Sequence, residues 1–280
     1  MNKTQQLLSL LCLSLFFACQ APSPESTPSD EAAPSESANT SGLKSIPDIP
    51  YELSLPKGYE DKKDSLSLLV VLDGNEYGGI AQNTAVLYEF GEKIFPTVVL
   101  SIPSTAESRW KYFTPTKATE SGNDPGNKAL YAYTGQFQTL ADYLRNELIP
   151  YIEKEYDIQF LQKSVFGHSM GGLAVLSFIV LQPDIFDHYI SASPSTMYDD
   201  HYIFKTIEEK GELDFESLFL TAAIDDSNGY RENVNWLAAY LEKNKQGDQR
   251  AMKQIFEGET HGTSGIKSLI YGMEFIGKNR

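Results

Sequence analysis

The stretch Gly167-His168-Ser169-Met170-Gly171 decides the fold, and it is the only G-x-S-x-G in the 280 residues. The segment at 163–166 precedes it and is predicted to be a short strand, and the largely apolar segment at 170–181 predicts a helix that ends near Pro183. A serine on such a sharp strand-to-helix turn presents its hydroxyl, and the residues two positions away must be small. The pattern predicts an α/β-hydrolase fold with Ser169 as nucleophile. A chance glycine-rich turn is the alternative.

Strands and helices alternate along the rest of the chain. Strands are predicted at 51–55, 66–72, 97–102, 189–192, 218–222 and 253–256, and helices at 80–94, 136–156, 202–209, 232–243 and 265–276. This order predicts a single α/β domain over residues 46–280, with a mostly parallel central sheet and helices on both faces. Functional residues in such folds gather beyond the carboxyl ends of the strands. The long polar segment 104–135 is a candidate wall or lid over a pocket.

A serine nucleophile needs a general base, and four histidines compete for that role. His168 adjoins the nucleophile, but a neighbouring side chain on a sharp turn points elsewhere. His188 and His201 precede the strand at 218–222, so neither fits the chain order serine, acid, histidine of this fold. His261 lies in a loop after the last predicted strand and is the predicted base. A histidine in a plain surface loop is the alternative.

The acid of the site is expected after the strand at 218–222. Asp225 and Asp226 both stand there, and either can orient His261. The other is then a solvated loop carboxylate or a helix cap. The carboxylate that does orient His261 would stabilise the imidazolium formed during catalysis.

Two backbone N–H groups are predicted to form the oxyanion hole. The Met170 N–H begins a helix directly after the nucleophile, so it is expected to face the oxyanion. The second N–H is expected from Asp73-Gly74-Asn75, which follows the second buried strand. A plain strand-ending turn is the other interpretation of these three residues, and the two interpretations are compatible.

The amino terminus has the pattern of an export signal. Lys3 precedes an apolar run at 7–18, which is too short to span a bilayer. Phe16-Phe17-Ala18-Cys19 resembles a bacterial lipobox, so residues 1–19 are predicted to be a lipoprotein signal with Cys19 as the lipidated residue. An ordinary signal peptide cut near Ala21 is the alternative. Residues 20–45 are rich in Ser and Pro and predict a disordered linker. We expect an exported protein, lipid-anchored in the cell envelope.

Composition narrows the possible partners. The formal net charge of -15 argues against nucleic acid and against charge-driven binding to anionic headgroups. The lipid on Cys19 is therefore the expected membrane contact. The two cysteines, Cys12 and Cys19, both precede the domain, which excludes a thiol nucleophile, a disulfide and a cysteine-based metal site there. We expect neither a metal nor a cofactor.

A set of motifs between residues 51 and 276 carries a family resemblance. The motifs are Leu72-Asp73-Gly74, Ile102-Pro103, Arg109 with Thr114-Pro115, 147–152, 166–173, 183–186, Ser193-Pro194-Ser195 and the late His261. With them the chain resembles the putative esterase family of the α/β-hydrolase superfamily, which includes esterase D and enterochelin-esterase-like proteins.

The resemblance implies roles for particular residues. Ser169, His261 and an aspartate that falls on Asp226 would form a catalytic triad. Asn75 and Met170 would form the oxyanion hole. Arg109 and Ser195 match family positions around the substrate pocket. For Arg109 two interpretations stay open, a contact to a polar or anionic substrate group and a structural ion pair.

The predicted function is hydrolysis of a carboxylic ester through an acyl-enzyme intermediate. The substrate is a small-molecule or carbohydrate ester, namely a siderophore ester, an acyl or feruloyl group on a polysaccharide, or a small acyl ester. An acyltransferase of the same fold is one alternative. A non-catalytic binding protein on a hydrolase scaffold is another, and the presence of Ser169, His261 and the two aspartates argues against it.

Overall fold

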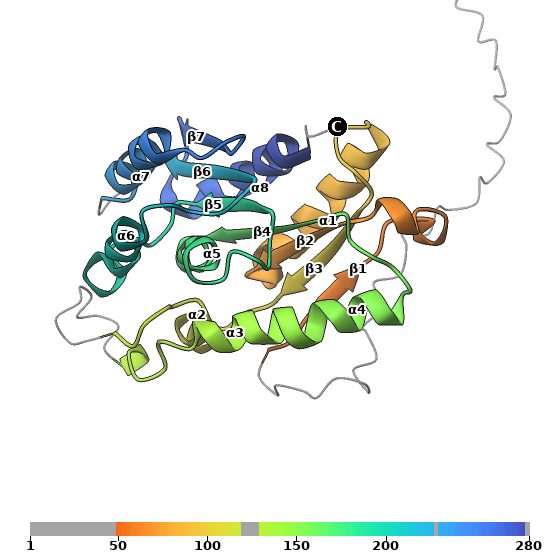
Figure 1. Cartoon of the computed structure of the whole chain (residues 1–280), viewed down its shortest axis with the longest axis horizontal. Helices are drawn as coiled ribbons and strands as arrows, with labels where there is room; N and C mark the ends of the chain where they lie inside the picture. The colour runs from red at the N-terminus through yellow and green to blue at the C-terminus, as the bar shows by residue number, and fades with distance from the viewer. Residues whose placement is uncertain (1–48, 119–128, 227–228, 278–280) are drawn as a thin grey trace, which may run out of the picture. The chain divides into compact units, whose positions relative to one another are not determined.

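The computed structural model describes residues 49–118, 129–226 and 229–277 (Figure 1). These residues all belong to one compact unit, Ser35–Arg280. The predicted signal peptide, Cys19 and the linker at 20–45 lie outside the described residues, as do residues 119–128 of the predicted loop. Within the described ranges no helix combines the length and the apolar character that a membrane span requires.

The described residues form one seven-stranded sheet. Its strands are β1 (Glu52–Ser54), β2 (Ser67–Leu72), β3 (Thr97–Ile102), β4 (Gln162–His168), β5 (His188–Ala192), β6 (Ser217–Ala223) and β7 (Arg250–Phe256). They lie in the order β1-β3-β2-β4-β5-β6-β7. β1 pairs antiparallel at one edge, and the other pairs are parallel. The prediction of a mostly parallel sheet is confirmed.

Helices cover both faces of this sheet (Figure 1). The helical segments are η1 (Tyr59–Asp61), η2 (Lys63–Ser65), α1 (Gly74–Phe90), α2 (Ala106–Tyr112), α3 (Phe137–Tyr143), η4 (Leu144–Leu148), α4 (Ile149–Glu155), α5 (Met170–Leu181), α6 (Tyr198–Lys210), α7 (Tyr230–Asn244) and α8 (His261–Gly277). The apolar side chains of α1 and α8 pack in one core on one face. Those of α3 to α7 pack in a second core on the other face.

Strand β2 is apolar from Leu68 to Leu72, and its position in the sheet explains why. All six of its residues are buried. Leu68, Val70 and Leu72 belong to the core under α3 to α7, whereas Leu69 and Val71 belong to the core under α1 and α8. Because successive side chains of a strand point to opposite faces, a strand covered on both faces is apolar at nearly every position.

The chain reverses direction across the sheet between β2 and β4. From β2 it runs to β3 on one side, and it then returns to β4 on the other side of β2. Ligands of open α/β sheets bind outside the carboxyl ends of the strands at such a switch point. Asp73 directly follows β2 and Ser169 directly follows β4, so both stand at this point.

Three elements before Ser169 differ from the predictions. The predicted helix at 80–94 begins earlier, because α1 starts at Gly74 directly after β2. Glycines at 78 and 79 interrupt its apolar period. Only glycine fits at position 78, because a Cβ there would lie 2.5 Å from Ser101 Oγ. The predicted long helix at 136–156 contains the π-helical turn η4 between α3 and α4. The predicted loop at 104–135 contains the short helix α2.

Candidate active site

Ser169 occupies a strained turn between β4 and α5. Its backbone has φ 59° and ψ −114°, a region that few residues other than glycine adopt. The neighbouring backbone is so close that a Cβ on Gly167 would lie 2.3 Å from the carbonyl oxygen of Gly171. The glycine spacing of the motif is therefore a steric requirement of the turn. The Ser169 N–H donates to the Ala192 carbonyl at 2.9 Å, which ties the turn to the end of β5.

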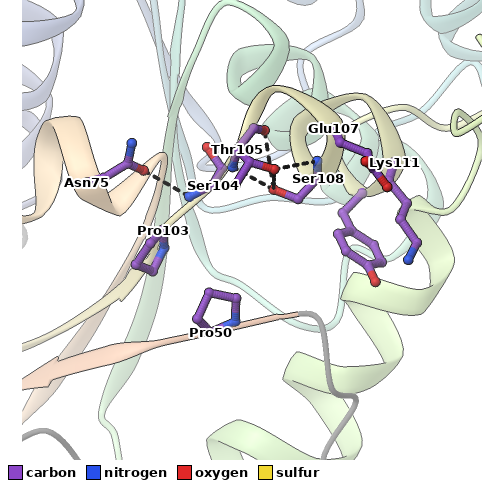
Figure 2. Close-up of a pocket in the computed structure, with 9 residues that line it drawn as sticks. Pro50, Asn75, Pro103, Ser104, Thr105, Glu107, Ser108 and Lys111 are labelled. Carbon is purple, nitrogen blue, oxygen red and sulfur yellow. Dashed lines mark hydrogen bonds between the residues drawn. The ribbon is translucent and has the colours of Figure 1, made fainter. Parts of the chain in front are cut away.

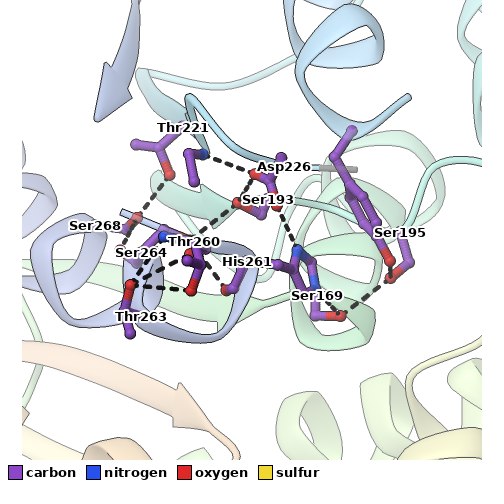
Figure 3. A network of polar contacts seen from close by, with 12 residues as sticks. Ser169, Ser193, Ser195, Thr221, Asp226, Thr260, His261, Thr263, Ser264 and Ser268 are labelled. Carbon is purple, nitrogen blue, oxygen red and sulfur yellow. Dashed lines mark hydrogen bonds and ion pairs between the residues drawn. The ribbon is translucent and has the colours of Figure 1, made fainter. Parts of the chain in front are cut away.

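Three of the predicted residues come together at the carboxyl edge of the sheet (Figure 3). Nε2 of His261 lies 3.0 Å from Oγ of Ser169. Nδ1 of His261 lies 2.7 Å from Oδ1 of Asp226. The Asp226 side chain is fully buried, whereas Asp225 is exposed. Of the two aspartates that the sequence left open, Asp226 is the one beside the imidazole.

His261 begins helix α8, although the sequence predicted a loop at this position and a helix from 265. Thr260 precedes the helix, and its N–H donates to Oγ1 of Thr263 at 3.0 Å. The Thr263 and Ser264 N–H groups donate back to the Thr260 carbonyl at 3.1 and 3.0 Å. These bonds close the first turn of the helix, so the histidine is held by regular secondary structure.

Asp226 is surrounded by hydrogen-bond donors. Burial alone would raise the pKa of this carboxyl group, but the hydrogen bonds from His261, Ser193 and the Ala223 N–H outweigh burial and lower its pKa. Oγ of Ser193 and the Ala223 N–H both donate to Oδ2, each at 2.7 Å. The carboxylate is thus kept charged without an arginine or lysine among these donors.

Two aromatic rings pack near the His261 imidazole. The Tyr230 ring centroid lies 4.2 Å from that of His261, and the His168 ring centroid lies 4.9 Å away. His168 is buried, and burial followed by repulsion from His261 lowers its pKa to about 4. His168 therefore stays neutral at ordinary pH. Its side chain was predicted to point away from Ser169, and in the structure it packs against the His261 ring.

The two N–H groups predicted for the oxyanion hole belong to helix beginnings. Met170 is the first residue of α5 and Asn75 the second residue of α1. N–H groups in a first helical turn have no partner within the helix, so they can bind an anion. The two turns are neighbours, because a Cβ on Gly171 would lie 3.4 Å from Oδ2 of Asp73. The Asn75 side chain is fixed by the Ser104 N–H, which donates to its Oδ1 at 2.8 Å.

Arg109 forms an ion pair with Asp73, one of the two interpretations that the sequence left open. Its Nε lies 2.7 Å from Oδ1 of Asp73, whose side chain is only 4% exposed. The Ser104 hydroxyl also donates to this carboxylate. The Arg109 side chain keeps 33% of its surface exposed. A contact between Arg109 and substrate stays a prediction.

Ser195 lies beside the nucleophile. Its Oγ is 3.3 Å from Oγ of Ser169 and 3.4 Å from the Tyr230 hydroxyl. Its N–H donates to the Ser169 carbonyl at 3.0 Å. Tyr230 was not predicted to belong to this site, and Ser193 was named only within the motif Ser193-Pro194-Ser195, without a role. For Ser193 a signal existed, because it directly follows a predicted strand.

A pocket of about 460 Å³ adjoins the turn that carries Asn75 (Figure 2). Of the predicted site residues, Asn75 is the one that lines it. The lining residues are Pro50, Asn75, Pro103, Ser104, Thr105, Glu107, Ser108, Lys111 and Tyr112. Its volume lies in the range of pockets that hold small organic ligands.

Fold and geometry together define a class of protein. A serine on a strand-to-helix turn, hydrogen-bonded to a histidine that is itself bonded to a buried aspartate, stands at the carboxyl edge of a mostly parallel sheet. This combination is the arrangement of serine hydrolases with the α/β-hydrolase fold.

Comparison with known proteins agrees. Residues 47–267 match the family described as Putative esterase. Ferri-bacillibactin esterase BesA of Bacillus subtilis is 27% identical over 211 residues, covering 69% of this chain and 73% of BesA. The siderophore triacetylfusarinine C esterase of Aspergillus fumigatus is 23% identical over 156 residues, covering 54% of this chain and 53% of that esterase. The crystal structure of an IroE-like serine hydrolase from Shewanella oneidensis has a TM-score of 0.73 at 23% identity, and the match covers 82% of this chain and 76% of that hydrolase.

The chain belongs to the putative esterase family, and it is a carboxylic ester hydrolase. The family and the fold expected from the sequence motifs are thereby confirmed.

Proposed function

We propose that this protein hydrolyses a siderophore ester, with Ser169 as nucleophile, His261 as general base and Asp226 as the acid that orients His261. The observation that carries the proposal is the unbroken hydrogen-bonded chain from Ser169 Oγ through His261 to the Asp226 carboxylate. The substrate class is supported by the two curated relatives, whose names describe siderophore esterases.

In the first step Oγ of Ser169 attacks the ester carbonyl while Nε2 of His261 takes its proton. The imidazolium then gives this proton to the departing alcohol, which leaves an acyl group on Ser169. In the second step His261 takes a proton from a water molecule, whose oxygen attacks the acyl carbon. Proton return to Ser169 Oγ releases the carboxylic acid and restores the enzyme.

Both tetrahedral intermediates carry a negative oxygen. The N–H groups of Met170 and Asn75 are the proposed donors to it, because both belong to neighbouring first helical turns. The Asp226 carboxylate stabilises the positive imidazolium that appears at the same moment. The pocket beside Asn75 offers room for a further part of a bulky ester.

The nucleophile is tested with a fluorophosphonate probe. The full-length protein is expected to be labelled at Ser169, and the Ser169→Ala variant is expected to remain unlabelled while it folds normally by circular dichroism. Labelling of the alanine variant at an unchanged rate would contradict the assignment.

The substrate class is tested by measuring kcat/KM on three kinds of ester, a siderophore lactone, a feruloylated sugar and a simple aryl ester. We expect the siderophore lactone to have the highest value. A higher value for the feruloylated sugar, with the lactone untouched, would refute the substrate proposal and leave the ester chemistry intact.

We also propose that the protein is exported and anchored by a lipid on Cys19. The proposal is supported by the apolar run that ends at this cysteine and by the Ser- and Pro-rich segment that follows it. Wild-type protein is expected in the membrane fraction, and Cys19→Ala is expected to be released or to retain its signal. A mature chain that begins at or after Gln20, determined by mass spectrometry, would contradict it.

A further inference from the structure

A chain of buried hydroxyl groups continues behind Asp226 (Figure 3). Oγ of Ser193 donates to Oδ2 of Asp226 at 2.7 Å, and Oγ of Ser264 lies 3.1 Å from Oγ of Ser193. Ser193 and Ser264 are completely buried. Ser193 follows β5, while Ser264 lies three residues after His261 on α8. The pair therefore connects the acid to the helix that carries the base.

We propose that Ser193, supported by Ser264, is a positioning residue for the esterase reaction, because it fixes the Asp226 carboxylate in the orientation that His261 requires. The inference rests on the triad roles proposed above.

The donors around the carboxylate support this role. Oδ1 of Asp226 accepts from His261, and Oδ2 accepts from Ser193 and from the Ala223 N–H. Of the two side chains among these donors, His261 transfers protons in the proposed reaction, whereas Ser193 does not. A hydrogen bond to a charged group is stronger than one between neutral groups, and a buried carboxylate has no water to replace a lost donor. The Ser193 bond also contributes to the lowered pKa of Asp226.

The backbone holds Ser193 in place for this bond. Its φ of 38° lies in the left-handed region, and its N–H donates to the Thr221 carbonyl on β6 at 2.8 Å. The single Ser193 hydroxyl proton goes to Asp226, so Ser264 can donate either to Ser193 Oγ or to the His261 carbonyl, which lies 3.3 Å away. In both arrangements the hydroxyl of Ser264 links the acid side to the first turn of α8.

The test compares Ser193→Ala with Ser268→Ala in the full-length protein. Alanine keeps the Cβ at position 193, so the backbone strain is the same in wild type and variant. Ser268 is also completely buried, and its Oγ bonds to Oγ1 of Thr221 and to the Ser264 carbonyl, each at 2.7 Å. It is the matched control, because both variants lose a buried hydroxyl bond but Ser268 is hydrogen-bonded to neither Asp226 nor His261.

For Ser193→Ala we expect kcat on an aryl ester to fall about 10- to 100-fold with KM within about twofold, as loss of a hydrogen bond to a charged group predicts. The acid limb of its kcat/KM profile should move to higher pH, because a carboxylate with fewer donors binds the imidazolium proton more tightly. The other titratable groups near the His261–Asp226 pair are not altered by the substitution; they are His168, Arg109 and Tyr230. Ser268→Ala should keep the wild-type kcat and pH profile. Ser193→Cys, which restores a weak donor, should recover part of kcat.

The outcomes separate the two proposals. Wild-type kcat and an unmoved acid limb in Ser193→Ala, with Asp226→Asn impaired, would overturn the positioning role alone. Equal losses in Ser193→Ala and Ser268→Ala with no shift of the limb would overturn it as well. If Asp226→Asn is also fully active, the triad assignment itself fails.

Discussion

Two buried aspartates stand at the carboxyl edge of the sheet, and the protein compensates their charges in different ways. Asp73, after β2, is paired with the permanently charged guanidinium of Arg109. Asp226, after β6, accepts three hydrogen bonds, and the donors are a hydroxyl, a backbone N–H and the imidazole of His261. One side chain is 4% exposed and the other fully buried, so burial does not distinguish them.

The way in which each charge is compensated decides whether the carboxylate can stabilise a further positive charge. The charge of Asp73 is already neutralised by a cation, so its effect lies in holding α2 and the beginning of α1 together. The charge of Asp226 is stabilised but not neutralised, so it remains able to attract a positive charge that arises on His261. We infer that Asp73 is a structural residue and that Asp226 acts in the reaction.

The largest effect should come from Asp226→Asn. The amide keeps the size of the side chain but favours the wrong tautomer of His261, which in serine hydrolases lowers kcat by about 10⁴-fold. Asp225→Asn is the matched control, because the neighbouring carboxylate is exposed, and it should stay within about twofold of wild type. Steady-state kinetics on an aryl ester measures both. A crippled Asp225→Asn enzyme would reverse the assignment.

Breaking the Asp73–Arg109 ion pair should lower the free energy of unfolding. Arg109→Ala leaves Asp73 buried without its cation, and we expect a loss of about 2 kcal/mol, below the usual 3–5 kcal/mol for a buried pair because Arg109 is 33% exposed. The melting temperature should fall by about 4–8 °C. Lys205→Ala, which removes an exposed pair with Asp200, should leave the melting temperature almost unchanged. Unchanged stability with a raised KM for Arg109→Ala would instead favour a substrate contact.

Acidification should lower the folding stability through His168, the buried histidine beside His261. His168 has its pKa lowered from 6.5 to about 4, so between these values the unfolded chain binds a proton that the folded protein does not, and stability falls as pH falls. At pH 5 the loss from this group is about 2 kcal/mol relative to pH 7.5. His168→Phe should reduce the difference between denaturant unfolding at these two pH values. The lowered pKa of His188 acts in the same direction, so part of the difference should remain.

Asp226 responds in a lower pH window. Its folded-state pKa is lowered, so its contribution to stability is complete above the unfolded value of about 3.9 and disappears as pH falls through the folded value. In Asp226→Asn the decline of stability below pH 4 should be smaller. A decline identical to that of wild type would show that other carboxyl groups dominate acid unfolding.

The parts of the fold that could be predicted are those with a strong local signal. The helix after Ser169 was predicted with the bounds of α5, because a largely apolar segment ends close to Pro183. The start of α1 was missed because glycines that fit against β3 also weaken the apolar period of the helix. The helix around η4 was predicted as one piece, because a π-helical turn leaves little trace in hydrophobic spacing.

The residues of the site also differ in whether the sequence could predict them. The nucleophile and the base could be selected by motif and by chain order. Motif and chain order left Asp225 and Asp226 open, and only the family resemblance favoured Asp226, because adjacent residues share every local property and differ in which one the fold buries. Ser193 was overlooked as a partner of the acid, since its contact to Asp226 joins residues 33 positions apart through the packing of β5 beside β6.

The left-handed backbone of Ser169 implies that this enzyme trades folding stability for activity. A non-glycine residue held in such a conformation costs on the order of 1–3 kcal/mol. Ser169→Gly removes the Cβ that causes this strain, so the inactive variant should melt at a higher temperature than the wild type. Any search for thermostable forms that does not also select for turnover will therefore tend to discard the proposed nucleophile.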